Sequence, residues 1–157
     1  MKLAVSADER THLVDVVLAD LQDRGHEVLF IGPESGEERD WPEVSAEAAE
    51  LVARGAMDQG IVMCWTGTGA TLAANKVPGA RAALCHDAET ARGARTWNHA
   101  NVLGLSLRST SEAVAREILD AWFGTAPGDD DWNLRQLERI GELEERYRRP
   151  PDQSRTP

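Results

Sequence analysis

Five short apolar segments alternate with amphipathic stretches along most of the chain. The apolar segments cover residues 3–7, 26–32, 60–65, 80–85 and 101–107. Nearly continuous apolar runs of this length are typical of strands in a parallel sheet that is buried on both faces. We therefore expect a sheet of five parallel strands.

The stretches between the strands have helical periodicity. In residues 12–25, Leu13, Val16, Val17 and Leu21 share one helical face, and Gly25 ends the segment. Similar stripes occupy residues 43–55, 70–76, 87–96 and 111–123. This alternation predicts a doubly wound α/β fold, a three-layer α/β/α sandwich of Rossmann-like type, in which ligands bind at the carboxyl ends of the strands.

A turn-rich break at residues 124–131 precedes one more helix. Residues 132–149 are heavily charged and carry a narrow apolar stripe that includes Leu134 and Leu143. Such a stripe packs on its own sheet or on a second copy of the chain, and we expect the former. The sequence thus predicts one domain over residues 1–149, with an extra C-terminal helix. Residues 150–157 are polar and rich in proline, and we expect them to be disordered.

The charge balance excludes several classes of partner. The 157 residues include 17 Lys and Arg against 27 Asp and Glu, a formal net charge of −10. Nucleic acids and anionic membranes require clustered cations, so neither is an expected partner. No apolar run is long enough for a bilayer, and the first residues lack the apolar core of a signal peptide. We expect a cytoplasmic protein whose two cysteines are reduced.

The aromatic residues are strongly biased toward tryptophan. Five of the eight are tryptophans, beside one Tyr and two Phe. Trp122 lies on an amphipathic stretch and is expected in the core. The other four are Trp41, Trp65, Trp97 and Trp132, and each falls in a segment considered below.

The segment with the clearest chemical signal is residues 61–76, IVMCWTGTGATLAANK. A strand ends at Cys64, and a Thr/Gly turn leads into a helix, so the amides of residues 67–70 converge on an anion site. The segment is neither a dinucleotide motif nor a phosphate loop. A cysteine beside such a site can act as a base or a nucleophile. We expect Cys85, by contrast, to pack as a small hydrophobic residue.

Residues 64–85, CWTGTGATLAANKVPGARAALC, resemble the signature of the ribose-5-phosphate isomerase B family, which is related to the galactose-6-phosphate isomerase subunits. Further similar segments follow the family order over residues 1–149. They are LAVSAD at 3–8, RGHEVLFIG at 24–32, EERDWP at 37–42, WNHANVLGLSLR at 97–108 and RQLERIGELEERY at 135–147.

The resemblance implies an activity. The family interconverts aldose and ketose phosphates through an enediolate, without a metal or other cofactor. Its members are homodimers whose sites contain residues of both subunits, and the sequence leaves a tetramer open. By this resemblance Cys64 moves the proton between C1 and C2, and Thr66 with the amides of Gly67 and Gly69 stabilises the enediolate oxygen. Also by resemblance, Asp8 holds sugar hydroxyls, Asn98 contacts a hydroxyl or the enediolate, and Arg108 contacts the phosphate. Asp40 and Trp41 are expected at the substrate as well.

Several positions depart from the family pattern. The imidazole that opens the sugar ring falls at Trp97, whose indole cannot transfer a proton. A family histidine falls at Glu9, and two phosphate-binding arginines fall at Trp132 and Gln136. The glycine that follows the family cysteine is Trp65. We therefore expect a pocket that is more aromatic and less suited to ribose 5-phosphate.

Two functions of different class remain open. The first is an isomerase with an altered substrate, such as an open-chain tetrulose phosphate or an unphosphorylated sugar. Trp65, Trp97 and Trp132 would then line its substrate pocket. The second is a non-catalytic sugar-binding or regulatory relative. His86 and His99 are candidates for a replacement acid. A plain nucleotide-binding domain is disfavoured because its fingerprint is missing, and the acidic run at 129–131 has no ordered ligand spacing, so no metal is expected.

Overall fold

The computed structural model describes residues 1–34, 37 and 39–148. Its five strands form one parallel sheet in the order β2-β1-β3-β5-β4. The strands are β1 (Lys2–Ala7), β2 (Glu27–Ile31), β3 (Gln59–Cys64), β4 (Ala82–Leu84) and β5 (Val102–Ser106). The predicted parallel sheet is confirmed, with β4 shorter than expected. Residues 150–157, expected to be disordered, lie outside the described residues.

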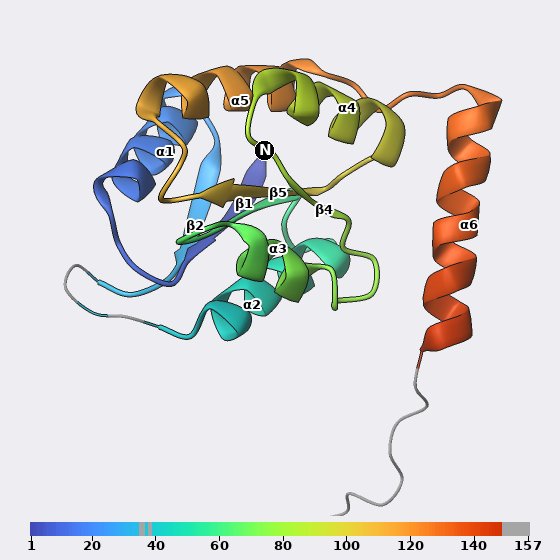
Figure 1. Cartoon of the computed structure of the whole chain (residues 1–157), viewed down its shortest axis with the longest axis horizontal. Helices are drawn as coiled ribbons and strands as arrows, with labels where there is room; N and C mark the ends of the chain where they lie inside the picture. Colours follow the sequence, from blue (N-terminus) through green and yellow to red (C-terminus); the bar gives the residue numbers. More distant parts are fainter. Residues whose placement is uncertain (35–36, 38, 149–157) are drawn as a thin grey trace, which may run out of the picture.

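Helices cover both faces of the sheet (Figure 1). On one face lie α1 (His12–Asp23), α4 (Ala88–Asn98) and α5 (Glu112–Gly124), and on the other lie α2 (Trp41–Ala53) and α3 (Thr68–Ala74). This arrangement confirms the three-layer α/β/α sandwich. No helix in the described part of the chain is both long and apolar enough to cross a bilayer.

Alternation along β3 divides the core into two clusters. Ile61 and Met63 pack with residues of α1, α4 and α5, whereas Val62 and Cys64 pack with residues of α2 and α3. Successive side chains of a strand point to opposite faces of a sheet, which accounts for this division. Cys64 therefore faces the layer that contains α3.

Trp122 is a core residue, as the sequence predicts. It is fully buried on α5. Its indole N–H donates a hydrogen bond of 2.6 Å to Oε1 of Gln59 on β3. A buried indole usually needs such a partner, so Trp122 has a structural explanation and no link to the candidate site.

The last helix, α6 (Asp131–Tyr147), stands beside the sandwich rather than on it (Figure 1). Leu134, Ile140 and Leu143 are each about 40 to 50% exposed there (42%, 39% and 48%). The expectation that this stripe packs on its own sheet is therefore wrong. The reason is the connection after α5, which holds the start of α6 beyond the end of α4. The amide of Gly128 donates to the carbonyl of Thr96 at 2.9 Å, and the His99 ring contacts the Gly128 carbonyl at 2.6 Å.

Candidate active site

Cys64 ends β3 and lies directly below the first turn of α3. The residue is buried, with 5% of its surface exposed. Its Sγ accepts a hydrogen bond from the amide of Ala70 at 3.4 Å. This contact places the sulfur at the amino end of α3.

The turn between β3 and α3 depends on a glycine. Gly67 has a φ of +75°, and a Cβ there would lie 2.6 Å from Cδ1 of Leu84 and 2.8 Å from the carbonyl oxygen of Leu105. Its amide donates to the carbonyl of Cys64 at 3.1 Å. Gly67 thus shapes the turn, and its N–H is already used rather than available to an enediolate as the resemblance implied.

Other donors surround the same point. The amides of Thr68 and Gly69 form no hydrogen bond within the part of the chain that the structure describes. The hydroxyls of Thr66 and Thr68 are hydrogen-bonded to each other at 2.7 Å. Of the predicted amides of residues 67–70, those of Thr68 and Gly69 therefore remain as donors beside the hydroxyl of Thr66, and only the side chain of Thr68 is a member that the sequence reasoning missed.

Two adjacent hollows open at this edge of the sheet. The first has a volume of about 270 Å³ and the second about 320 Å³. Asp8, Trp41 and Trp65 line both hollows. The first is completed by Cys64, Thr66, Thr68 and Gly69, and the second by Glu9, Arg39 and Asp40. The structure thus brings together most of the residues predicted from the N-terminal half.

The second hollow is acidic. Among the described residues, three carboxylates line it, against the single guanidinium of Arg39. The amide of Arg39 donates to the carbonyl of Asp8 at 2.9 Å, which fastens this loop to the end of β1. Arg39 is a second residue that the sequence reasoning missed, although it directly precedes the predicted Asp40. Its long side chain reaches the hollow only because the loop folds back onto β1.

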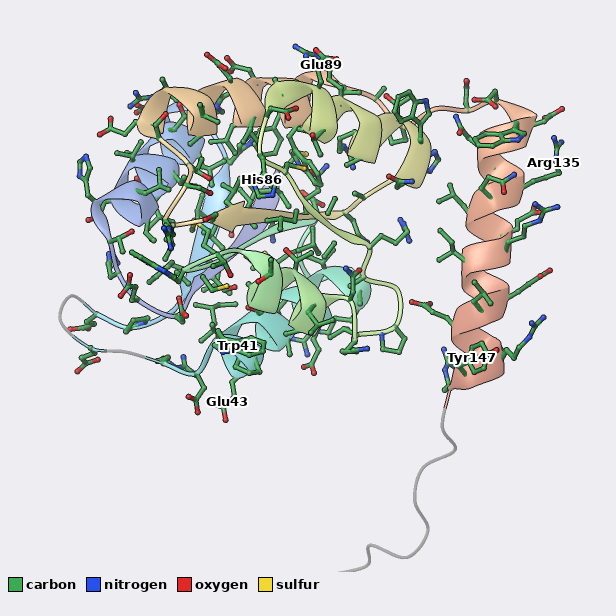
Figure 2. All side chains as sticks on the ribbon, in the orientation of Figure 1. Trp41, Glu43, His86, Glu89, Arg135 and Tyr147 are labelled. Atoms are coloured by element: carbon green, nitrogen blue, oxygen red, sulfur yellow. The ribbon has the colours of Figure 1, made fainter. Side chains whose placement is uncertain are left out.

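Trp41 is packed against the anion site. It begins α2, which lies next to α3 (Figure 2). A Cβ at Gly69 would lie 3.1 Å from the Trp41 indole, so a larger residue at position 69 would require the ring to shift by a few tenths of an ångström. Trp41 is 40% exposed and forms a wall of both hollows.

Trp65 has a fixed backbone and a free side chain. Its carbonyl accepts hydrogen bonds from the amide of Arg108 at 2.9 Å and from Oγ of Ser106 at 3.0 Å. These bonds join the end of β3 to the loop after β5, and they place the backbone of Arg108 beside the site. The indole of Trp65 is 56% exposed and forms the second shared wall.

Three predicted residues lie elsewhere. Trp97 and Asn98 end α4, which leads to the amino end of β5, whereas Cys64 pairs with Ser106 at its carboxyl end. Five strand residues separate these two edges by about 13 Å. Asn98 lines a different hollow of about 460 Å³ against α6, and Trp132 lies on α6. One copy of the chain does not bring these residues to Cys64.

The remaining polar candidates do not join the site either. His99 contacts the Gly128 carbonyl, and neither it nor His86 lines the hollows that contain Trp65. Arg135 on α6 points away from the sandwich (Figure 2). Among the described residues, no cluster of His, Cys, Asp or Glu side chains is suited to a metal ion.

Cys85 follows β4 and has a different environment from Cys64. It is fully buried in the core beneath α4. Burial, with a smaller contribution from the charge of Asp87, raises the pKa of its thiol to about 12. Cys85 is therefore a neutral core residue at physiological pH, in agreement with the sequence prediction.

Comparison with known proteins identifies isomerases of sugars and sugar phosphates as relatives of this chain. The family model described as Ribose/Galactose Isomerase matches residues 3–142. The chain is 37% identical to ribose-5-phosphate isomerase B of Escherichia coli over 130 residues, which cover 83% of this chain and 87% of that protein. It is 34% identical to D-erythrulose-4-phosphate isomerase of Pectobacterium atrosepticum over 146 residues, 92% and 95% of the two chains.

Solved structures agree with the sequence matches. Ribose-5-phosphate isomerase B of Clostridium thermocellum superimposes with a TM-score of 0.88 and 37% identity. The match covers 94% of this chain and 99% of that one. The chain therefore has the same α/β fold as this solved relative.

Proposed function

The chain belongs to the ribose/galactose isomerase family, and we propose that it is an aldose–ketose isomerase of a sugar or sugar phosphate, with Cys64 as the base. The observation that carries this proposal is the position of Cys64. Its buried sulfur accepts the Ala70 amide and lines a hollow together with Thr66 and Gly69. A base and oxyanion donors thus face one small space.

These residues match the needs of an enediolate mechanism. The Cys64 thiolate removes the proton from C2 of the aldose and returns it to C1, while a hydroxyl proton moves from O2 to O1. Negative charge develops on the carbonyl oxygen in the transition state. The amides of Thr68 and Gly69 and the hydroxyl of Thr66 are the donors that stabilise this charge.

The substrate we propose is an open-chain, four-carbon sugar phosphate. An aldotetrose or tetrulose 4-phosphate has no free hydroxyl able to close a five-membered ring, so it needs no ring-opening imidazole. Trp97 at the imidazole position is compatible with such a substrate and incompatible with proton transfer to a closed ring. The relative named D-erythrulose-4-phosphate isomerase supports the same substrate class.

Ribose 5-phosphate is a poor substrate in this proposal. Trp132 and Gln136 stand where the resembled family has arginines, so bidentate bonds to phosphate are lost. Glu9 adds a carboxylate beside the second hollow. Phosphate binding then depends on a cation in a different place, such as Arg108, whose backbone lies beside the site.

We propose that the working unit is a homodimer, with a tetramer as a further possibility. The exposed stripe of α6 supports this, since it includes Leu134, Ile140 and Leu143. A second copy would bury that stripe and would bring its own Trp97, Asn98 and Trp132 toward Cys64, which one copy alone does not do.

The test is exchange of the carbon-bound hydrogen in D₂O. Four-, five- and six-carbon ketoses and their phosphates are incubated with the wild type, Cys64→Ala and Cys85→Ala, and deuterium incorporation is followed by NMR. We expect exchange with the four-carbon phosphate, its loss in Cys64→Ala and its retention in Cys85→Ala. No exchange with any compound would contradict the proposal.

The same experiment decides the alternative function. Trp97 in place of a proton-transferring imidazole also favours a sugar-binding relative without activity. That protein would bind sugars in calorimetry and would exchange no hydrogen with any of them. Binding without exchange, unchanged in Cys64→Ala, would establish the alternative.

A further inference from the structure

Trp65 occupies a special position among the residues of the two hollows. Its indole is a wall of the hollow that contains Cys64 and of the acidic hollow that contains Glu9, Arg39 and Asp40. A substrate that reacts at Cys64 and extends toward the acidic hollow must pass this indole.

The backbone of Trp65 is held in place, which fixes the point from which the indole projects. Its carbonyl is held by the Arg108 amide and the Ser106 hydroxyl, and the preceding residue is the end of β3. Trp41, the other aromatic wall, is in turn packed against Gly69. The opening between the two hollows is therefore bounded by two rings.

The size of the first hollow limits what can bind without passing Trp65. Its volume of about 270 Å³ is below the range of roughly 300 to 1,000 Å³ that is usual for ligand pockets. If C1 and C2 lie at Cys64 and the carbon chain runs toward Trp65, a short chain stays on the near side of the indole, and each added carbon moves the phosphate toward the space beyond it.

Charge makes the longer chain less favourable still. In the acidic hollow, the carboxylates of Glu9, Asp40 and Asp8 outnumber the guanidinium of Arg39 among the residues that the structure describes. A phosphate dianion that is pushed into this space is repelled, because like charges at close range in a partly desolvated pocket interact strongly. Steric and electrostatic costs therefore both increase with chain length.

We propose that Trp65 is a specificity-determining residue that sets the upper limit on the carbon chain of the substrate. This inference rests on the proposed isomerase function and adds to it the residue that selects a four-carbon over a five-carbon sugar phosphate. Removing the indole joins the two hollows, so that the longer chain reaches past position 65 without displacing a ring.

The experiment compares kcat/KM for D-erythrulose 4-phosphate and D-ribulose 5-phosphate. The wild type prefers the four-carbon compound. In Trp65→Gly and Trp65→Ala we expect that preference to fall by about 10- to 200-fold, the usual range for one methylene group in a fitted pocket. Trp65→Phe keeps a ring and is expected to keep most of the preference. Circular dichroism checks that each variant is folded.

A binding measurement separates this inference from the proposed function. The four-carbon and five-carbon aldonate phosphates carry a carboxylate in place of the enediolate, and their affinities are measured by calorimetry without any reaction. A wild-type preference for the shorter compound that Trp65→Gly abolishes supports the role of Trp65, even if no turnover is found. Unchanged preferences in Trp65→Gly overturn it while leaving the isomerase intact, and a wild type that neither binds nor converts either compound overturns both.

Discussion

The two cysteines show how surroundings decide the chemistry of identical side chains. Both follow apolar strand sequences, Cys64 at the end of β3 and Cys85 after β4. Cys64 has a backbone amide at its sulfur and a hollow beside it. Cys85 is enclosed in the core, where burial raises the pKa of its thiol to about 12. Only Cys64 is therefore placed to react.

This difference predicts selective alkylation. Because the thiolate is the reactive form, iodoacetamide should modify Cys64 and leave Cys85 unmodified in the folded protein at pH values well below 12. The measurement is mass spectrometry of peptides after labelling at pH 7, 8 and 9. In denaturant both cysteines should react, which is the control. Comparable native labelling of Cys85 would show that the core around it opens or that its pKa is ordinary.

At the scale of elements, the β3–α3 turn is the part of the fold that creates the site. The strand ends at Cys64, Gly67 reverses the chain with a positive φ, and the free amides of α3 follow at once. The Cα of the same glycine lies close to Leu84 and Leu105, so the turn also packs on β4 and β5. A change in the backbone of the β3–α3 turn would therefore also move the donors of the candidate site.

A pair of glycine substitutions tests this interpretation. Gly67→Ala should lower the free energy of unfolding by about 1 to 3 kcal/mol from φ strain and by a further amount from overlap with Leu84 and Leu105. Gly55 has a similar φ of +73° but no atom within 4 Å of a Cβ, so Gly55→Ala reports strain alone. Urea unfolding measures both. Equal losses in the two variants would mean that the packing at Gly67 is unimportant.

At the scale of the whole molecule, the candidate site is divided between two edges of the sheet. Cys64, Thr66 and Gly69 line a hollow at the carboxyl edge. Asn98 lies at the opposite edge beside α6. Strand length fixes this separation within one copy, and the exposed stripe of α6 offers a surface on which a second copy can pack.

Mixed oligomers test whether two copies share each site. Cys64→Ala and Asn98→Ala should each be inactive alone, whereas co-refolding them should restore activity, since some dimers then contain one intact site. A mixture of Cys64→Ala with Thr66→Ala should stay inactive, because both changes lie in the same hollow. Activity assays with light scattering, expected to give twice the mass of one chain, are the measurement. Failure to complement would mean that Asn98 does not act across an interface.

Local patterns account for the parts of the site that the sequence predicted correctly. Cys64, Thr66 and Gly69 are within six residues of one another, so a strand, a turn and a helix are enough to bring them together. The role of Gly67 was less predictable. Its amide is used within the turn, where the residue has a φ of +75° and lies close to Leu84 and Leu105.

The sequence by itself determined the five strands, the helices between them and the segment that holds Cys64, because apolar periodicity and turn residues act over a few positions. Only the tertiary structure decided that Arg39 and the hydroxyl of Thr68 join the site, that Trp65 lines two hollows, and that α6 stands off its own sheet. These features depend on how loops distant in sequence pack against one another. The Gly128 and His99 contacts that hold α6 away from the sheet join residues about thirty positions apart, which no local pattern records.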